Sequence, residues 1–156
     1  MEKAIFAAGC FWGVQLDYDG VEGVLSTVVG YVGGHTENPT YEAVSAGTTH
    51  HAEAVEVTFD PDIVTFEALL DFFWQCHNPT TLNQQGPDRG SQYRSAIYYR
   101  SQEQRRAAEK SRDACDAAGL WPDPVVTEIT TASQFWPAED YHQKYLEKRN
   151  ITISCH

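Results

Sequence analysis

The stretch KAIFAAGCFWGV at residues 3–14 decides how the fold begins. Its first six residues form a short, mostly apolar run, which predicts a buried strand ending at Gly9, a residue that favours a turn. The next five residues, from Cys10 to Val14, can begin a helix. The pattern therefore places Cys10 at a strand-to-helix junction.

Periodicity and capping residues predict the other elements. Alternating or β-branched residues indicate strands, and apolar residues three and four apart indicate helices. Further strands are predicted at 24–32, 52–59, 95–99 and 125–130, and helices from about Thr65 toward Cys76, from Ser101 to Gly119, and from Ala138 to Lys148 behind Pro137. Residues 78–94 are rich in Pro, Gly, Asn and Gln, which is typical of a loop that carries function.

The order of these elements predicts an α/β (α+β) fold. We expect a two-layer sandwich with a mixed β-sheet and a ferredoxin-like core. Residues 1–149 are predicted to form a single domain. Residues 150–156 show no periodicity and are predicted to form a mobile C-terminal tail.

Composition and charge exclude several classes of partner. The chain has 156 residues and a formal net charge of -11, which repels phosphate backbones and anionic lipid surfaces. No apolar run approaches the length that spans a bilayer. We therefore expect no nucleic acid and no membrane as partner, and we expect a monomer.

The four cysteines, at positions 10, 76, 115 and 155, lie far apart and form no C-x-x-C pair. Zinc-ribbon spacing is absent, so we expect neither a metal nor another cofactor. The chain is too long and too poor in cysteine to depend on disulfides. This pattern favours a reducing compartment, and we expect a cytoplasmic protein.

Cys10 is a candidate nucleophile. The start of a helix offers unpaired N–H groups and the positive end of the peptide dipoles, which stabilise a thiolate. Phe11 and Trp12 place two aromatic rings beside the sulfur, where they can contact methyl and thioether groups. The alternative is that both rings simply fill the core.

Glu53 is the second candidate, because it shares strand parity with Val55, Val57 and Phe59 and is expected to project toward the apolar face. Desolvation there raises the pKa of a carboxyl group and keeps it protonated near neutral pH, as a general acid requires. The alternative is a break of register at the strand start that leaves Glu53 in solvent.

Six motifs together carry a resemblance to a known family. In chain order they are Gly9 to Gly13, Gly30 to Gly34, Asn38 to Tyr41, His51 to Val55, Gln85 to Ser95, and Ala138 to Gln143. This set resembles the peptide methionine sulfoxide reductases of the A type, over about residues 3–148. The resemblance implies an enzyme, a thiol-dependent oxidoreductase that reduces methionine sulfoxide, free or in proteins, to methionine.

The resemblance also implies roles for individual residues. Cys10 attacks the sulfoxide sulfur, Glu53 donates a proton, and the phenol groups of Tyr41 and Tyr93 hydrogen-bond the sulfoxide oxygen. Phe11 and Trp12 hold the methyl group of the substrate. Asp88 matches a carboxylate near the site, although a turn cap is an equally good role for it. Kinship further implies selectivity for the S epimer.

Recycling requires a second thiol, because loss of methionine leaves Cys10 as a sulfenic acid that condenses with a thiol. Cys155 on the tail is the best candidate, whereas Cys76 and Cys115 fall on helices and are expected to be structural. We expect a Cys10–Cys155 disulfide that a thioredoxin-type dithiol reduces. Some family members carry a thiol in the segment after the Asn-Pro-Thr-Tyr motif, where this chain has Ser45.

Two other functions fit parts of the pattern. One is a cysteine hydrolase that uses Cys10 with His51 or His142 as base. The other is a non-enzymatic redox-sensing module with an aromatic recognition pocket. A carboxylate on the apolar face and a thiol on the tail argue against acyl transfer, which needs neither.

Overall fold

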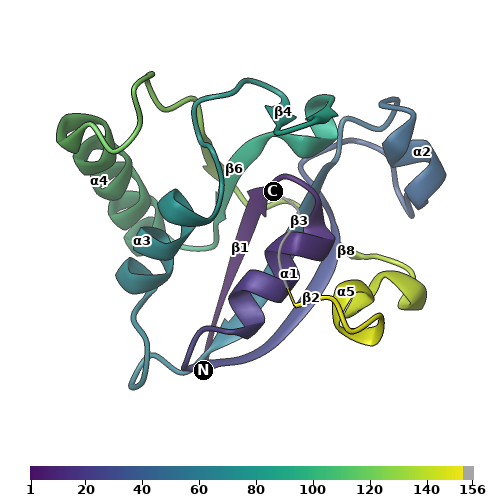
Figure 1. The fold of residues 1–156 in the computed structure, drawn as a ribbon, viewed down its shortest axis with the longest axis horizontal. Coiled ribbons are helices and arrows are strands. Elements are labelled where there is room, and N and C mark those ends of the chain that lie inside the picture. Colours follow the sequence, from purple (N-terminus) through teal and green to yellow (C-terminus); the bar gives the residue numbers. More distant parts are fainter. Residues whose placement is uncertain (153–156) are drawn as a thin grey trace.

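A six-stranded mixed sheet organises the computed structural model, which describes residues 1–152 (Figure 1). The strands lie in the order β7-β6-β1-β3-β2-β8. Neighbouring strands are antiparallel except for the parallel pair β6 and β7. The bounds are β1 (Glu2–Ala8), β2 (Val24–Val32), β3 (Ala52–Phe59), β6 (Ser95–Tyr99), β7 (Glu128–Thr131) and β8 (Trp136–Pro137).

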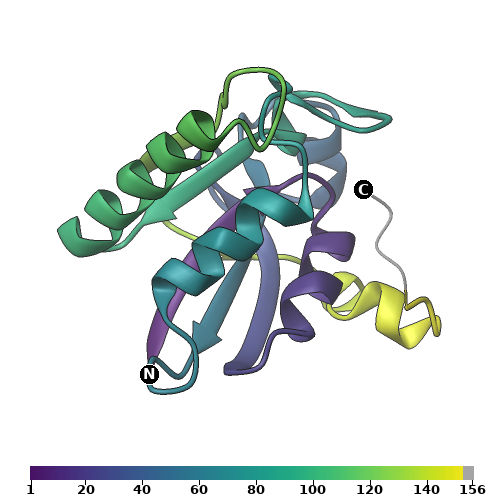
Figure 2. The same cartoon turned by 60° about the vertical axis from the view of Figure 1, so that its left-hand side comes forward.

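Three longer helices pack on this sheet, namely α1 (Phe11–Asp19), α3 (Phe66–Cys76) and α4 (Gln102–Ala118). The chain order β1-α1-β2-β3-α3-β6 with the spatial order β6-β1-β3-β2 gives two interlocked β-α-β units. This is the ferredoxin-like core, so the predicted fold class is confirmed. Figure 2 shows the helices lying against one face of the sheet.

Shorter elements complete the molecule around the strand ends. They are α2 (Tyr41–Ser45), the hairpin of β4 (Gln84–Gln85) and β5 (Asp88–Arg89), the 3₁₀ turns η1 (Ser91–Tyr93) and η2 (Asp140–His142), and α5 (Tyr145–Lys148). The hairpin and η1 fall in the predicted functional loop at 78–94. The short helix α2 was not predicted, although Thr40 caps it by accepting a hydrogen bond from Ala43 N.

The apolar core on one face of the sheet is larger than the core on the other. Alternate β3 residues Val55, Val57 and Phe59 point to the helices and join the main core, in which Phe6 stacks on Tyr18 with ring centroids 5.0 Å apart. The opposite face carries small residues such as Ala52 and Ala54, covered by Ala132 and Phe135. Burying an aromatic side chain contributes about 1.5–3 kcal/mol, so the helix face dominates the core.

The helices α3 and α4 agree closely with the sequence pattern. The buried residues of α3 are the predicted set, Phe66, Leu69, Leu70, Phe73 and Trp74. Thr65 caps this helix, and Ser101 caps α4 by accepting from Gln104 N. Gly119 ends α4 in the left-handed conformation at φ 64°.

The predicted helix at 138–148 is wrong. Trp136 and Pro137 instead form β8 beside Gly30 and Tyr31 at the sheet edge. The Gln143 side chain exchanges hydrogen bonds with both backbone groups of Val29, each at 3.0 Å, and Lys144 takes a left-handed φ of 57°. Contacts with the sheet thus replace most of the local helical hydrogen bonds, and the segment keeps only the 3₁₀ turn η2 and the short α-helix α5.

The strand predicted at 125–130 is correct in position but begins later, at Glu128. Val125 N bonds the Asp116 carboxylate, and Val126 N bonds the Pro79 carbonyl. The backbone N–H groups of Val125 and Val126 therefore bond neighbouring segments, and the chain pairs with β6 only from Glu128.

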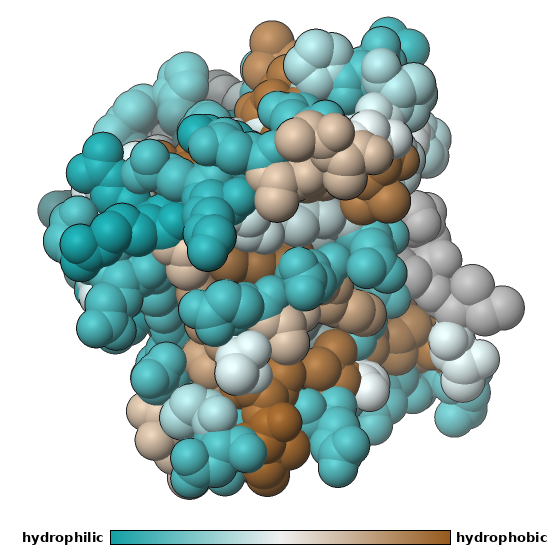
Figure 3. All heavy atoms as spheres, turned by 90° about the vertical axis from the view of Figure 1, so that its left-hand side faces the viewer, coloured by the Kyte–Doolittle hydropathy of each residue, from teal (hydrophilic) through white to brown (hydrophobic). Residues whose placement is uncertain are grey.

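The surface over α3 and α4 is largely hydrophilic, with apolar side chains visible between bands of hydrophilic ones (Figure 3). A groove between the two helices is lined in part by Trp74, Ala107, Cys115 and Leu120. Within residues 1–152, no helix combines the length and apolar character needed to cross a membrane.

Candidate active site

Cys10 caps the N-terminus of α1 directly after the turn that ends β1. Its thiol is half-buried, and its carbonyl accepts the first helical bond from Val14 N at 3.3 Å. Gly9 before it has φ 101°, and a Cβ there would lie only 2.7 Å from the Gln85 side chain. A glycine is therefore required, because it lets the β4–β5 hairpin approach the turn that carries the thiol.

Glu53 lies on the helix face of β3 and is only 2% exposed. Its Oε1 accepts a hydrogen bond of 3.1 Å from the backbone N–H of Phe11, the residue after Cys10. Burial raises the pKa of Glu53 to about 8, the Phe11 bond opposes that shift, and the charge of Asp88 adds to it. A carboxyl group that is protonated at neutral pH therefore lies at the helix start beside the thiol.

Two tyrosines lie close enough to Cys10 and Glu53 to interact with both. Tyr41 opens α2 and Tyr93 ends η1. Burial raises the pKa of each phenol, and the charges of Glu53 and Cys10 raise it further. Asp88 on β5 also acts on Glu53 and Tyr93. The two phenol groups thus stay protonated and able to donate hydrogen bonds near the thiol.

Aromatic rings form one wall beside the thiol. Phe11 is fully buried and lies 5.7 Å from the Tyr31 ring and 6.5 Å from the Tyr41 ring. Trp12 is half-buried and stacks on Tyr145 with ring centroids 3.7 Å apart. Phe11 therefore fills core, while Trp12 keeps part of its surface exposed.

Sequence reasoning missed a supporting pair of residues, Tyr31 and Glu139. Glu139 accepts hydrogen bonds from the Tyr31 hydroxyl at 2.8 Å and from Tyr41 N at 3.0 Å. Burial raises the pKa of Glu139, but these bonds outweigh it and the net shift is downward. An ionised Glu139 therefore anchors the start of α2, and with it Tyr41. The motif from Ala138 to Gln143 contains Glu139, but nothing in the sequence indicates this anchoring role.

Cys76, Cys115 and His51 lie apart from this arrangement. Cys76 ends α3, where burial strongly raises the pKa of its thiol, and Cys115 is buried on α4. Cys155 lies outside the described residues. His51, the first of the two candidate bases for a hydrolase, has both ring nitrogens bonded to backbone, at Gly34 N and Thr36 O.

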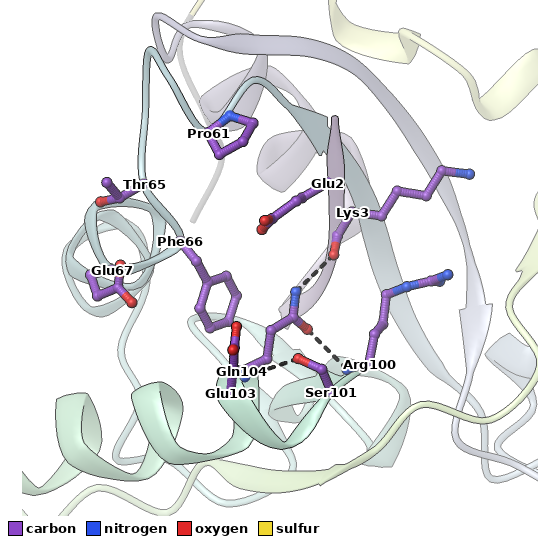
Figure 4. A pocket seen from close by; sticks show the side chains of 10 residues that line it. All are labelled: Glu2, Lys3, Pro61, Thr65, Phe66, Glu67, Arg100, Ser101, Glu103 and Gln104. Carbon is purple, nitrogen blue, oxygen red and sulfur yellow. Dashed lines mark hydrogen bonds between the residues drawn. The ribbon is translucent and has the colours of Figure 1, made fainter.

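The pocket drawn in Figure 4 lies at the other end of β1 from Cys10. It is lined by Glu2 and Lys3 and by the starts of α3 and α4, and Gln104 bridges its floor through Lys3 O and Arg100 N. Among residues 1–152, no cluster of three or more His, Cys, Asp or Glu side chains is placed to hold a metal ion.

Comparisons with known proteins agree with this geometry. The model of the family "Peptide methionine sulfoxide reductase" matches residues 2–156. The peptide methionine sulfoxide reductase MsrA of Methanothermobacter thermautotrophicus is 61% identical over 147 residues, which cover 94% of this chain and 87% of the relative.

Solved structures show the same fold. Mxr1 from Saccharomyces cerevisiae in reduced form is 33% identical, with a TM-score of 0.92 over 99% of this chain and 88% of that one. Mxr1 in complex with Trx2 superposes with a TM-score of 0.66 at 24% identity, over 92% and 84% of the two chains. Because the family model spans nearly the whole sequence, the chain belongs to the peptide methionine sulfoxide reductase family of enzymes.

Proposed function

We propose that this protein reduces methionine sulfoxide to methionine with Cys10 as nucleophile and Glu53 as general acid. One observation carries the proposal: a buried glutamic acid with a pKa of about 8 bonds the backbone N–H next to the thiol residue. A sulfoxide sulfur becomes electrophilic only when its oxygen is protonated or strongly hydrogen-bonded, so a thiolate beside a neutral acid meets the need.

The chemistry proceeds in two stages. The Cys10 thiolate attacks the sulfoxide sulfur, and Glu53 donates its proton to the sulfoxide oxygen, which Tyr41 and Tyr93 hold by hydrogen bonds. The oxygen then transfers from the substrate sulfur to the Cys10 sulfur: the substrate S–O bond and the sulfur–sulfur bond made by the attack both break, a Cys10 S–O bond forms, and methionine departs, leaving Cys10 as a sulfenic acid. Sulfur in the substrate is reduced and sulfur in Cys10 is oxidised by the same two electrons.

In this proposal the substrate contacts both apolar and polar side chains of the site. The methyl group of the substrate contacts Trp12, next to the buried ring of Phe11, while the oxygen faces the phenol groups and Glu53. A pocket with one polar side and one apolar side distinguishes the two epimers at sulfur, and the proposed substrate is the S epimer, free or in proteins. Asp88 acts on this pocket through its charge.

Recycling in this proposal uses the tail. The Cys155 thiol condenses with the sulfenic acid, releases water and forms a disulfide with Cys10. A thioredoxin-type dithiol then reduces the disulfide, which is consistent with the solved complex of the yeast relative Mxr1 with Trx2. We place this monomeric enzyme in the cytoplasm, where thioredoxin and glutathione keep thiols such as Cys76 and Cys115 reduced.

The test compares Cys10→Ser with the matched control Cys115→Ser, whose thiol lies on α4. Pure protein is incubated with methionine sulfoxide and dithiothreitol, and methionine is measured by chromatography. We expect the control to match the parent protein and Cys10→Ser to form no methionine. An active Cys10→Ser variant, or hydrolysis of an ester or amide in place of reduction, contradicts the proposal.

A second test addresses Cys155. Cys155→Ser should complete a single turnover, with one methionine formed per protein, but lose recycling by thioredoxin. Undiminished turnover with thioredoxin would show that another thiol or direct reduction resets Cys10.

A further inference from the structure

A single hydrogen bond joins the aromatic wall of the site to η2. The indole Nε1 of Trp12 lies 2.9 Å from Nδ1 of His142. An indole N–H can only donate, so Nδ1 must be unprotonated, and a neutral ring then carries its proton on Nε2. The contact therefore exists in one protonation state and one tautomer of His142.

The surroundings of His142 favour that neutral state. The ring is 1% exposed and lies between Tyr41 and Tyr141, at centroid distances of 4.3 and 4.0 Å. Burial lowers the pKa of His142 from its ordinary value, and this outweighs the opposing charges of Glu139 and Glu42. Among the described residues, the buried Nε2 has no hydrogen-bond partner. Little in this environment supports a charged imidazolium.

Trp12 needs two kinds of restraint, and His142 supplies the one that stacking lacks. Tyr145 lies nearly parallel to the indole, at an interplanar angle of 6°, and the guanidinium of Arg149 covers the Tyr145 ring at 3.6 Å. Stacking fixes the plane of a ring but resists sliding and rotation within that plane only weakly. A directional hydrogen bond at Nε1 fixes the in-plane orientation.

We propose that His142 is a positioning residue for substrate binding, which acts by fixing the in-plane orientation of Trp12 through an acceptor at Nδ1. The inference rests on the proposed function, in which Trp12 contacts the substrate's methyl group. That contact is made in the ground state and in the transition state alike, so its loss raises KM more than it lowers kcat.

The first experiment compares His142→Phe with His142→Asn in the reduction of methionine sulfoxide with dithiothreitol. Phenylalanine keeps an aromatic ring without an acceptor, whereas the Asn Oδ1 can accept from Trp12 near the position of Nδ1. We expect His142→Phe to raise KM about five- to tenfold, as expected for one lost hydrogen bond, with kcat within about threefold. We expect His142→Asn to restore KM to within about twofold. Equal KM values for the two variants would overturn the proposal.

A double-mutant cycle provides the matched control. Trp12→Phe removes the N–H donor but keeps a ring on Tyr145. In that background, His142→Phe should change KM by less than about twofold, because no donor remains for it to lose. A full five- to tenfold effect in the Trp12→Phe background would show that His142 acts by another route and overturn the proposal.

The second readout requires no turnover. The chain has four tryptophans, and the indole N–H of Trp121 bonds the Trp74 carbonyl at 3.0 Å, which makes it an internal reference. In the NMR spectrum of ¹⁵N-labelled protein, His142→Phe should shift the Trp12 indole signal and speed its exchange with water, leaving the Trp121 signal unchanged. His142→Asn should keep the Trp12 signal protected.

The two readouts separate the possible failures. An unchanged Trp12 indole signal in His142→Phe refutes the positioning role, whether or not the parent protein is active. If the parent protein reduces no methionine sulfoxide but His142→Phe shifts the Trp12 indole signal as expected, the proposed function is refuted and the Trp12–His142 hydrogen bond is supported.

Discussion

Two glutamates three residues apart on β3 show how placement decides chemistry. Glu53 faces the helices and is almost fully buried, and the only bond of its carboxyl group among the hydrogen bonds and ion pairs of residues 1–152 is to the Phe11 N–H. Glu56 faces the other side, 3.6 Å from the Lys3 ammonium and 3.8 Å from the Arg100 guanidinium. Nearby cations favour a carboxylate, whereas burial without a cation favours the protonated acid. One strand thus presents an ion-pair partner on one face and the proposed proton donor on the other.

The largest expected effect is the one that separates these two residues. Glu53→Gln keeps the shape of the side chain but cannot donate a proton, so we expect the rate of sulfoxide reduction at pH 7 to fall about 10²–10⁴-fold. The matched control Glu56→Gln should stay within about threefold of the parent protein. Steady-state rates with dithiothreitol measure both, and equal losses would remove the distinction between the two faces.

The next effect concerns the phenol groups. Tyr93→Phe removes one donor to the developing charge on oxygen, which in comparable sites costs about 10²-fold in kcat. Tyr98→Phe is the control, since Tyr98 is buried on the opposite face of the sheet. Measurement of kcat for both variants decides the point, and a loss below about threefold for Tyr93→Phe would assign that hydroxyl no part in the reaction.

The pH profile sharpens the comparison further. Because the pKa of Glu53 is about 8, the proton it donates is present below that pH and lost above it. We expect kcat/KM to fall about tenfold per pH unit above roughly pH 8. The residual activity of Glu53→Gln should lack this limb, and a limb that persists in that variant would belong to another group.

Stability should respond to pH in a defined direction. The pKa of Glu53 is raised from 4.5 to about 8, so its contribution to the free energy of unfolding is fully present below pH 4.5 and is lost as pH rises through about 8. Glu53→Gln removes that loss, and we expect its stability relative to the parent protein to be roughly 2–5 kcal/mol better at pH 9 than at pH 4.5. Glu56→Gln should change stability by about 1 kcal/mol or less, because the side chains of its partners Lys3 and Arg100 are 50% and 46% exposed. Urea unfolding at the two pH values tests both statements.

Local patterns predicted the central fold well. The alternation of β3 and the apolar spacing of α3 are signals of single elements, and the structure follows both. The prediction of a helix at 138–148 failed because this segment makes hydrogen bonds with β2 and α1. Gln143 bonds Val29, and Lys144 N bonds Gln15. Such long-range bonds produce no periodic pattern in the sequence of the segment itself.

The site also has features that the sequence predicted and features that it could not predict. Strand parity indicated that Glu53 is buried, and the helix start indicated the position of Cys10. The hydrogen bonds of Glu139 to Tyr31 and Tyr41 span about a hundred residues of sequence, and only the folded chain reveals them. Kinship supplied the roles of Tyr41 and Tyr93, which no spacing in the sequence encodes.

The wide separation of the site residues has a consequence for synthesis of the protein. The Phe11–Glu53 bond joins residues 42 apart and the Trp12–His142 bond residues 130 apart. Cys10 therefore leaves the ribosome well before Glu53, and His142 emerges later still. A nascent chain thus carries the thiol before the proposed proton donor, so we expect its capacity for sulfoxide reduction to arise only after both Glu53 and His142 have emerged.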